Sequence, residues 1–203
     1  MNWQLHRSNG FQIPGSKLES SQIDPVVTRF ANMSLLHQTK HLNEMTEARR
    51  NSMEMFFSRF EPSLSSTVNY LQNGPLNSDS HYLMIIEKEG ELFGHFGFKV
   101  LTSDEIELDN VMRVKPLIRG LMTLKIAEFI EWLKAETDIK RISLRVINTN
   151  VPAISMYSAL GFEMIRELDL RSVEDGYSMQ SLVPCSPDVS NSQYKMVIMS
   201  MAL

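Results

Sequence analysis

Three carboxylates alternate along residues 105–114, where the pattern of side chains predicts a β-strand. Successive side chains of a regular strand point to opposite faces, so Glu105, Glu107 and Asp109 are expected on the same face. A carboxylate held beside a substrate can accept a proton from it, which is the role of a general base. The alternative is a solvated strand face on which acidic groups are common.

Residues 141–162, with the sequence RISLRVINTNVPAISMYSALGF, predict a strand, a turn and a helix in succession. Apolar residues alternate in the first part, and the second part is rich in asparagine, which favours turns and helix caps. Asn150 is placed to cap the helix, and Pro152 suits its first turn. Gly161 is placed to end the helix, and Phe162 can pack back on the last turn.

The same helix carries a specific motif, in which Asn150, Ala153, Tyr157, Gly161 and Phe162 follow the strand with the spacing N-x-x-A-x-x-x-Y-x-x-x-G-F. This motif resembles the acyl-CoA-binding segment of the GNAT superfamily of N-acyltransferases. The alternative is any short amphipathic helix that begins with Asn and ends with Gly. The resemblance implies an α/β (α+β) fold with a mixed, mainly antiparallel central sheet. Helices flank that sheet, and it is splayed at the two strands that hold acyl-CoA.

The resemblance also implies roles for individual residues. In the family, the strand that corresponds to residues 105–114 bears a bulge and donates backbone groups to the pantetheine arm, which suggests Met112 and Val114 as cofactor contacts. The strand often carries the carboxylate that removes a proton from the acceptor amine. An amine attacks only when it is neutral, so a base is needed. Asp109 is the first candidate for that base and Glu107 the second.

Tyr157 resembles the tyrosine that protonates the departing CoA thiolate in many family members, and Asn150 is expected to contact the pantetheine as well as to cap its helix. For Tyr157 the alternative is a packed aromatic ring with its hydroxyl at the surface. His95, on a predicted strand, is a further candidate base because the pKa of histidine lies near neutrality.

A helix is predicted after residue 120, and the resemblance places the pyrophosphate of CoA at its start. Backbone amides and the positive end of the helix dipole can bind an anion there. The candidates are Arg119, Gly120, Leu121 and Met122. The family pattern is V-x-P-x-x-R/Q-x-x-G-x-G/A. This chain departs from it, because two residues are missing between Arg119 and Gly120 and Met122 replaces Gly or Ala. The departure puts individual loop residues in doubt more than the fold.

The composition is that of an ordinary soluble protein of 203 residues, with a formal net charge of −4 and dispersed basic residues. A large nucleic-acid surface is therefore not expected. The single cysteine, Cys185, excludes an internal disulfide, and the sequence shows no signal peptide or membrane span. We expect a cytoplasmic protein without a metal, because the pair His37 and His41 has no evident third ligand.

The remaining chain is expected to form one domain over residues 25–203, preceded by a partly ordered arm over residues 1–24 that holds one edge strand at 11–13. The other predicted elements are strands at 26–33, 81–88, 92–101, 162–170 and 194–201, helices at 39 to about 59 and from 65 to about 73, and a loop at 181–192. In the family the two helices form much of the wall around the acceptor substrate.

Together these observations predict an N-acetyltransferase that uses acetyl-CoA as cosubstrate and a primary amine as acceptor, with direct attack in a ternary complex. The acidic net charge favours a small molecule such as an amino sugar over a ribosomal acceptor. The alternatives are a protein or ribosomal-protein N-acetyltransferase, or a module that binds acyl-CoA without turnover. A homodimer is left open.

Overall fold

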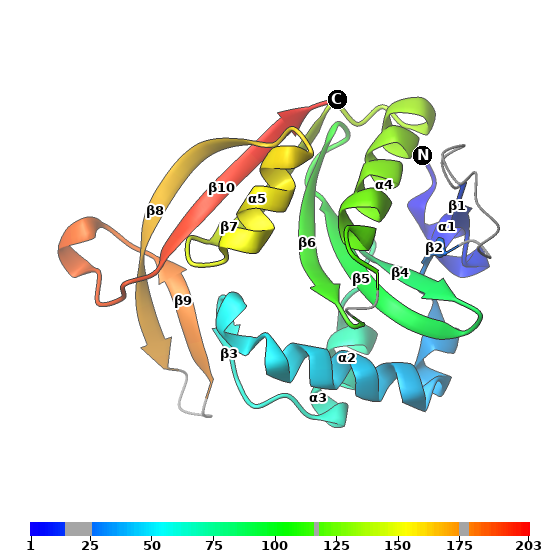
Figure 1. The fold of residues 1–203 in the computed structure, drawn as a ribbon, viewed down its shortest axis with the longest axis horizontal. Helices are drawn as coiled ribbons and strands as arrows, with labels where there is room; N and C mark the ends of the chain where they lie inside the picture. The colour runs from blue at the N-terminus through cyan, green and yellow to red at the C-terminus, as the bar shows by residue number, and fades with distance from the viewer. Residues whose placement is uncertain (15–25, 116–117, 175–178) are drawn as a thin grey trace.

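The computed structural model describes residues 1–14, 26–115, 118–174 and 179–203 (Figure 1). Their strands form one mixed sheet in the order β1-β2-β4-β5-β6-β7-β10-β8-β9-β3. The strands are β1 (Gln12–Ile13), β2 (Val27–Phe30), β3 (Ser58–Arg59), β4 (His81–Lys88), β5 (Glu91–Val100), β6 (Glu105–Arg113), β7 (Arg141–Ile147), β8 (Glu163–Glu174), β9 (Gln180–Pro184) and β10 (Lys195–Ala202).

Helices cover both faces of this sheet, as predicted. They are α1 (Trp3–Asn9), α2 (Thr39–Asn51), α3 (Leu64–Asn73), α4 (Leu121–Glu136) and α5 (Val151–Ala159), with short 3-10 helices at Met33–His37, Met53–Met55 and Pro187–Val189. Alternate residues of β4 separate the two faces. Met84 and Ile86 pack in the core that includes α4, whereas Leu83 and Ile85 pack in the core under α2 and α3.

The sheet is splayed at its centre, as the resemblance implied. Strands β6 and β7 are the parallel neighbours, and their pairing runs only from Glu105 opposite Arg141 to Leu108 opposite Leu144. Beyond Leu108 the two strands separate, with α4 lying beside β6 and α5 beside β7 (Figure 1). The backbone groups of β6 that face β7 beyond this point therefore have no strand partner on that side.

A bulge in β6 lies where the two strands part. Asp109 is opposite Gly97 of β5 and Met112 is opposite His95, so two residues of β6 lie opposite one residue of β5. Asn110 is one of those two and has a φ of 47°, which a non-glycine residue rarely adopts. The bulge turns the end of β6 away from β7 and changes the direction in which its side chains point.

Two predicted boundaries are wrong for a single reason. The helix expected to reach about residue 59 ends at Asn51, and the loop expected at 181–192 contains β9. Strand β3 follows the shortened helix and pairs with β9 through Ser58 opposite Ser181. Such short strands form only because a distant segment pairs with them, and no local pattern in the sequence indicates that pairing.

The N-terminal segment is more ordered than predicted. The expected edge strand is confirmed as β1, and residues Trp3–Asn9 form α1, which the sequence reading missed. The Trp3 ring lies 5.1 Å from the Phe98 ring and 6.0 Å from the Trp132 ring. This segment therefore packs on the core beneath α4. The predicted boundary at residue 24 lies outside the described residues, so the division into arm and domain stays a prediction.

Candidate active site

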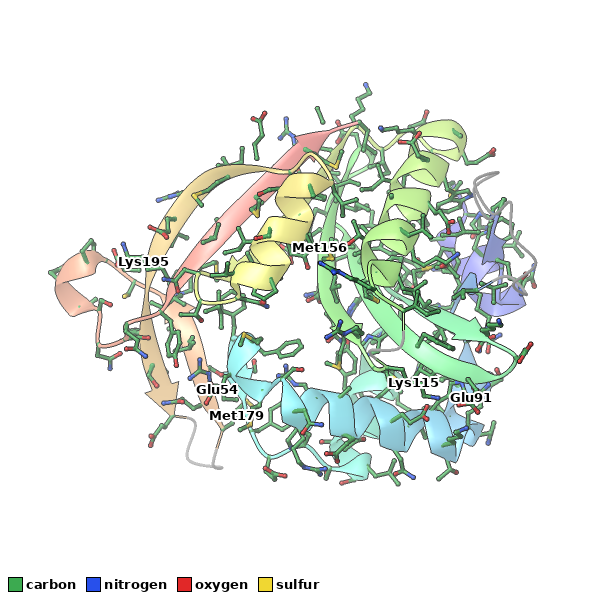
Figure 2. All side chains as sticks on the ribbon, viewed as in Figure 1. Glu54, Glu91, Lys115, Met156, Met179 and Lys195 are labelled. Atoms are coloured by element: carbon green, nitrogen blue, oxygen red, sulfur yellow. The ribbon has the colours of Figure 1, made fainter. Side chains whose placement is uncertain are left out.

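A cleft of about 890 Å³ opens where β6 and β7 separate. Its sides are the ends of β6 and β7, the start of α4 and the inner side of α5, where Met156 lies (Figure 2). The opposite wall comes from α2, α3, β3 and β9. The cleft brings together eight of the predicted site residues, namely Glu107, Asp109, Met112, Gly120, Leu121, Met122, Asn150 and Tyr157.

The start of α4 borders this cleft. Gly120 precedes the helix in the left-handed conformation, with a φ of 79°. The first amides of an α-helix have no acceptor within the helix, and the helix dipole adds positive potential there. Leu121, Met122 and Thr123 contribute the first turn and line the cleft. This geometry fits a phosphate or pyrophosphate group.

Met122 occupies a position where the resembled family has a small residue, and the structure shows how its side chain fits. Met122 is buried. A Cβ placed on Gly94 of β5 would lie only 2.7 Å from the Met122 sulfur. The missing side chain at Gly94 therefore leaves the space that Met122 fills, and the methionine packs between α4 and the sheet.

Two predicted cofactor contacts do not line the cleft. The Val114 amide donates to the Phe93 carbonyl at 2.9 Å, and the Val114 side chain packs on the core under α2 and α3. Arg119 is exposed and outside the cleft wall. Lys115 pairs with Glu91 of β5 (Figure 2) and lies 3.3 Å from Glu44. These contacts tie the end of β6 to the sheet edge and to α2.

Asn150 caps α5 as predicted. Its Oδ1 accepts a hydrogen bond from the Ala153 amide at 3.3 Å. At the other end Gly161 has a φ of 95°, and the Phe162 amide donates to the Tyr157 carbonyl at 3.0 Å. The Tyr157 and Phe162 rings pack edge to face, 5.8 Å apart. Both ends of this short helix are therefore fixed by local contacts, which orient Tyr157.

Tyr157 lies in the cleft and is only 6% exposed. Burial raises the pKa of its hydroxyl, and the negative charge of Asp109 raises it further. The hydroxyl is therefore protonated at neutral pH and can donate a hydrogen bond or a proton. The alternative for this residue, a packed ring with its hydroxyl at the protein surface, therefore does not fit the buried position of Tyr157.

The candidate carboxylates are ion-paired. Arg145 Nη2 of β7 lies 2.6 Å from Glu107 Oε1, and Lys99 Nζ of β5 lies 2.8 Å from Asp109 Oδ2. Glu107 belongs to the paired part of β6, whereas Asp109 is the first residue after the pairing with β7 ends. The charge of Asp109, but not that of Glu107, contributes to the raised pKa of Tyr157. Asp109 is therefore the candidate carboxylate whose charge acts on the Tyr157 hydroxyl.

Several residues of the site were not predicted. His81 Nε2 of β4 lies 3.6 Å from Asp109 Oδ2, and burial lowers the pKa of His81. Asn110, on the bulge, donates from Nδ2 to the Tyr70 hydroxyl of α3 at 2.8 Å. Burial, followed by the charge of Asp109, raises the pKa of Tyr70. His81 and Tyr70 come from β4 and α3, so no spacing in the sequence relates them to Asp109.

His95 lies behind the bulge and is only 1% exposed, although it borders the cleft. Its Nδ1 has no hydrogen-bond partner among the described residues. Burial lowers the pKa of His95 to about 4, an effect that a hydrogen bond with the Asn110 backbone partly opposes. His95 is therefore neutral near pH 7 and supports the backbone of the bulge.

The lowered pKa of His95 predicts a loss of stability in acid. Between about pH 6.5 and pH 4 the unfolded chain binds a proton at this residue and the folded chain does not. At pH 5 the penalty is about 2 kcal/mol of unfolding free energy. Urea unfolding of the wild type and of His95→Gln at pH 7.5 and pH 5 measures it, and we expect a smaller loss in the variant. Equal losses in both proteins would contradict this assignment.

The described residues contain no cluster of three or more His, Cys, Asp or Glu side chains arranged to hold a metal. None of the described helices is both long enough and apolar enough to cross a membrane.

The sequence model of the Acetyltransferase (GNAT) family matches residues 43–162 of this chain. A Bacillus subtilis protein, described as a candidate ribosomal protein bS18 alanine N-acetyltransferase, is 35% identical over 89 residues. That alignment covers 43% of this chain and 56% of the relative, so the chain matches little more than half of the relative's length.

Solved structures share the fold at low sequence identity. A ribosomal-protein-alanine N-acetyltransferase from Brucella melitensis has a TM-score of 0.58 and 16% identity, over 81% of this chain and 96% of that one. RimL, a ribosomal L7/L12 alpha-N-protein acetyltransferase in complex with CoA, has a TM-score of 0.65 and 11% identity, over 95% of this chain and 98% of that one.

Proposed function

The chain belongs to the GNAT acetyltransferase family, and we propose that it transfers an acetyl group from acetyl-CoA to a primary amine. One observation carries the proposal. The separation of β6 and β7 after Leu108 opens a cleft into which the start of α4, Asp109 and Tyr157 all project. An anion site, a proton acceptor and a proton donor therefore border the same space. The CoA bound to the similar RimL structure supports the choice of cosubstrate.

The chemistry follows from these groups. The start of α4 would bind the pyrophosphate, and the β6 backbone beyond Leu108 would bind the pantetheine arm in place of a strand partner. The neutral amine attacks the thioester carbonyl, so the new N–C bond forms as the C–S bond breaks. Asp109, directly or through water, accepts the amine proton, and Tyr157 donates a proton to the thiolate.

Two acceptor classes are candidates. A small-molecule amine, for example an amino sugar, was the expectation from the acidic net charge. The name of the Bacillus subtilis relative favours the second class, the α-amino group of a protein. Thiol release with acetyl-CoA, measured over a panel of amino sugars, amino acids and short peptides, separates the two classes. If none of these acceptors were acetylated, the alternative that remains would be a module that binds acyl-CoA without catalysis.

Binding of the cosubstrate is expected to stabilise the folded protein. A ligand that binds only the folded state adds about 2.7 kcal/mol at a hundred times its dissociation constant. We expect both acetyl-CoA and free CoA to raise the melting temperature, because each carries the pyrophosphate and the pantetheine. ATP is the control, because it has phosphates but no pantetheine. No shift with either CoA species would mean that the cleft does not bind the cosubstrate.

A further inference from the structure

Arg49, in the last turn of α2, borders the cleft opposite α5 and was not among the predicted site residues. Its Nη2 donates to the Ser58 carbonyl of β3 at 2.6 Å. The guanidinium carbon lies 3.4 Å from the centre of the Phe56 ring and 5.5 Å from that of Phe60. The arginine is therefore held flat against an aromatic surface.

The other terminal nitrogen of this side chain has no hydrogen-bond partner in the part of the chain that the structure describes. Arg49 Nη1 is buried and makes no hydrogen bond to any described residue. A buried N–H group of a charged side chain is costly to leave unpaired. Burial lowers the pKa of Arg49 to about 10, with Tyr70 and Asp109 opposing the change, so the side chain keeps its positive charge near pH 7.

Arg49 has no ion-pair partner among the described carboxylates around the cleft. Glu107 is paired with Arg145, and Asp109 is paired with Lys99. No carboxylate of the described residues lies within 4 Å of the Arg49 guanidinium nitrogens. An anion that entered this part of the cleft would meet a positive charge without displacing a protein carboxylate.

The surface around Arg49 is mainly apolar. The apolar and aromatic side chains that border the cleft on this wall are Met45, Met55, Phe56, Phe57, Phe60 and Tyr70, and Ser52, Ser58, Ser66 and Thr67 line it as well. A bound molecule that reached Arg49 would therefore lie along methionine and aromatic side chains. Such a wall suits an acceptor with an apolar portion better than a sugar, whose hydroxyl groups need hydrogen-bond partners.

We propose that the acceptor amine carries a carboxylate close to the reacting nitrogen, and that Arg49 binds this carboxylate. The inference rests on the proposed acetyl transfer and specifies its acceptor. One unpaired positive charge balances one carboxylate, whereas a phosphate dianion would need a second cation. The amine would then lie toward Asp109, and the apolar part of the acceptor would pack on Phe56 and Phe60. The carboxylate can come from a free amino acid or from an acidic residue next to the amino end of a peptide.

The test compares acceptors that differ only in this carboxylate. Phenylalanine is paired with phenylalaninamide, and a peptide with aspartate in its second position is paired with the same peptide carrying asparagine. For each pair, kcat/KM from thiol release gives a ratio of carboxylate to amide. The wild type should prefer the carboxylate in at least one pair, and the pair that shows the preference identifies its source.

Arg49→Gln should lower that ratio about 10- to 100-fold, as expected for one hydrogen bond to a charged group. The ratio is measured within one protein preparation, so a variant that is partly unfolded still gives a valid value. Arg49→Lys keeps the charge but not the planar group, and should retain part of the preference. Arg50→Gln is the matched control, since Arg50 is the next residue of α2 and pairs outside the cleft with Glu61.

A carboxylate preference that is unchanged in Arg49→Gln would overturn the proposal and leave Arg49 with only its contacts to Ser58 and to the Phe56 and Phe60 rings. So would a wild type that prefers both amides. If no amine is acetylated, the carboxylate site can still be tested by calorimetry, in which N-acetylphenylalanine and its amide are each titrated into the CoA-bound protein. Binding of the acid alone, lost in Arg49→Gln, would support the carboxylate site even though the proposed transfer had failed. Binding of neither compound would overturn it.

Discussion

Asp109→Asn is expected to lower kcat about 100- to 10,000-fold, the usual loss when a general base is removed. The replacement keeps the shape of the side chain and cannot take up the amine proton. Lys99, which then loses its partner, is 36% exposed, so the fold should tolerate the change. Steady-state thiol release over a range of pH measures the effect. The rate of the variant should rise more steeply with pH than that of the wild type, because solvent deprotonates the amine at high pH.

Glu107→Gln is the matched comparison for Asp109. Glu107 lies on the same strand, two residues earlier, and is bound to Arg145 in the paired part of β6. We expect its loss to reduce kcat much less than the loss of Asp109. A larger reduction in Glu107→Gln than in Asp109→Asn would assign the base to Glu107 instead. If both variants were as active as the wild type, neither Glu107 nor Asp109 would be the general base.

Tyr157→Phe is expected to lower kcat about 100-fold, because the departing thiolate loses its proton donor. The ring remains, so its packing on Phe162 and the shape of the cleft should be preserved. The KM for acetyl-CoA should therefore change little. Burst and steady-state kinetics of thiol release measure the loss, and the melting temperature with CoA checks that binding is intact.

The control for Tyr157 is Tyr70→Phe, since Tyr70 also borders the cleft and its hydroxyl bonds to Asn110. We expect that change to affect the bulge and to reduce kcat less than Tyr157→Phe. A Tyr157→Phe enzyme with kcat within twofold of the wild type would show that the thiolate leaves without help from this hydroxyl.

Local patterns in the sequence predicted a large part of this structure. The strand, turn and helix at 141–162 were predicted with the cap at Asn150 and the stop at Gly161, because each depends on neighbours within one or two turns. The strand β4 was found for the same reason. The resemblance added the splay between β6 and β7, which periodicity alone does not reveal.

What the sequence could not reveal depends on contacts between distant segments. The pairing of β3 with β9 joins residues more than a hundred positions apart, and neither strand is long enough to show a pattern. The ion pairs of Glu107 and Asp109 likewise depend on strand register. The place of Arg49 in the cleft was not predicted, because the aromatic ring of Phe56 that it packs on follows after its helix ends.

The most direct test of the account is a mass measurement of the acceptor after incubation with acetyl-CoA and the purified protein. Free CoA should appear in equal amount to an acetylated amine, and Asp109→Asn should form both products far more slowly at neutral pH. Cosubstrate binding without any acetylated amine, over amino sugars, amino acids and peptides, would contradict acetyl transfer and leave a protein that only binds CoA.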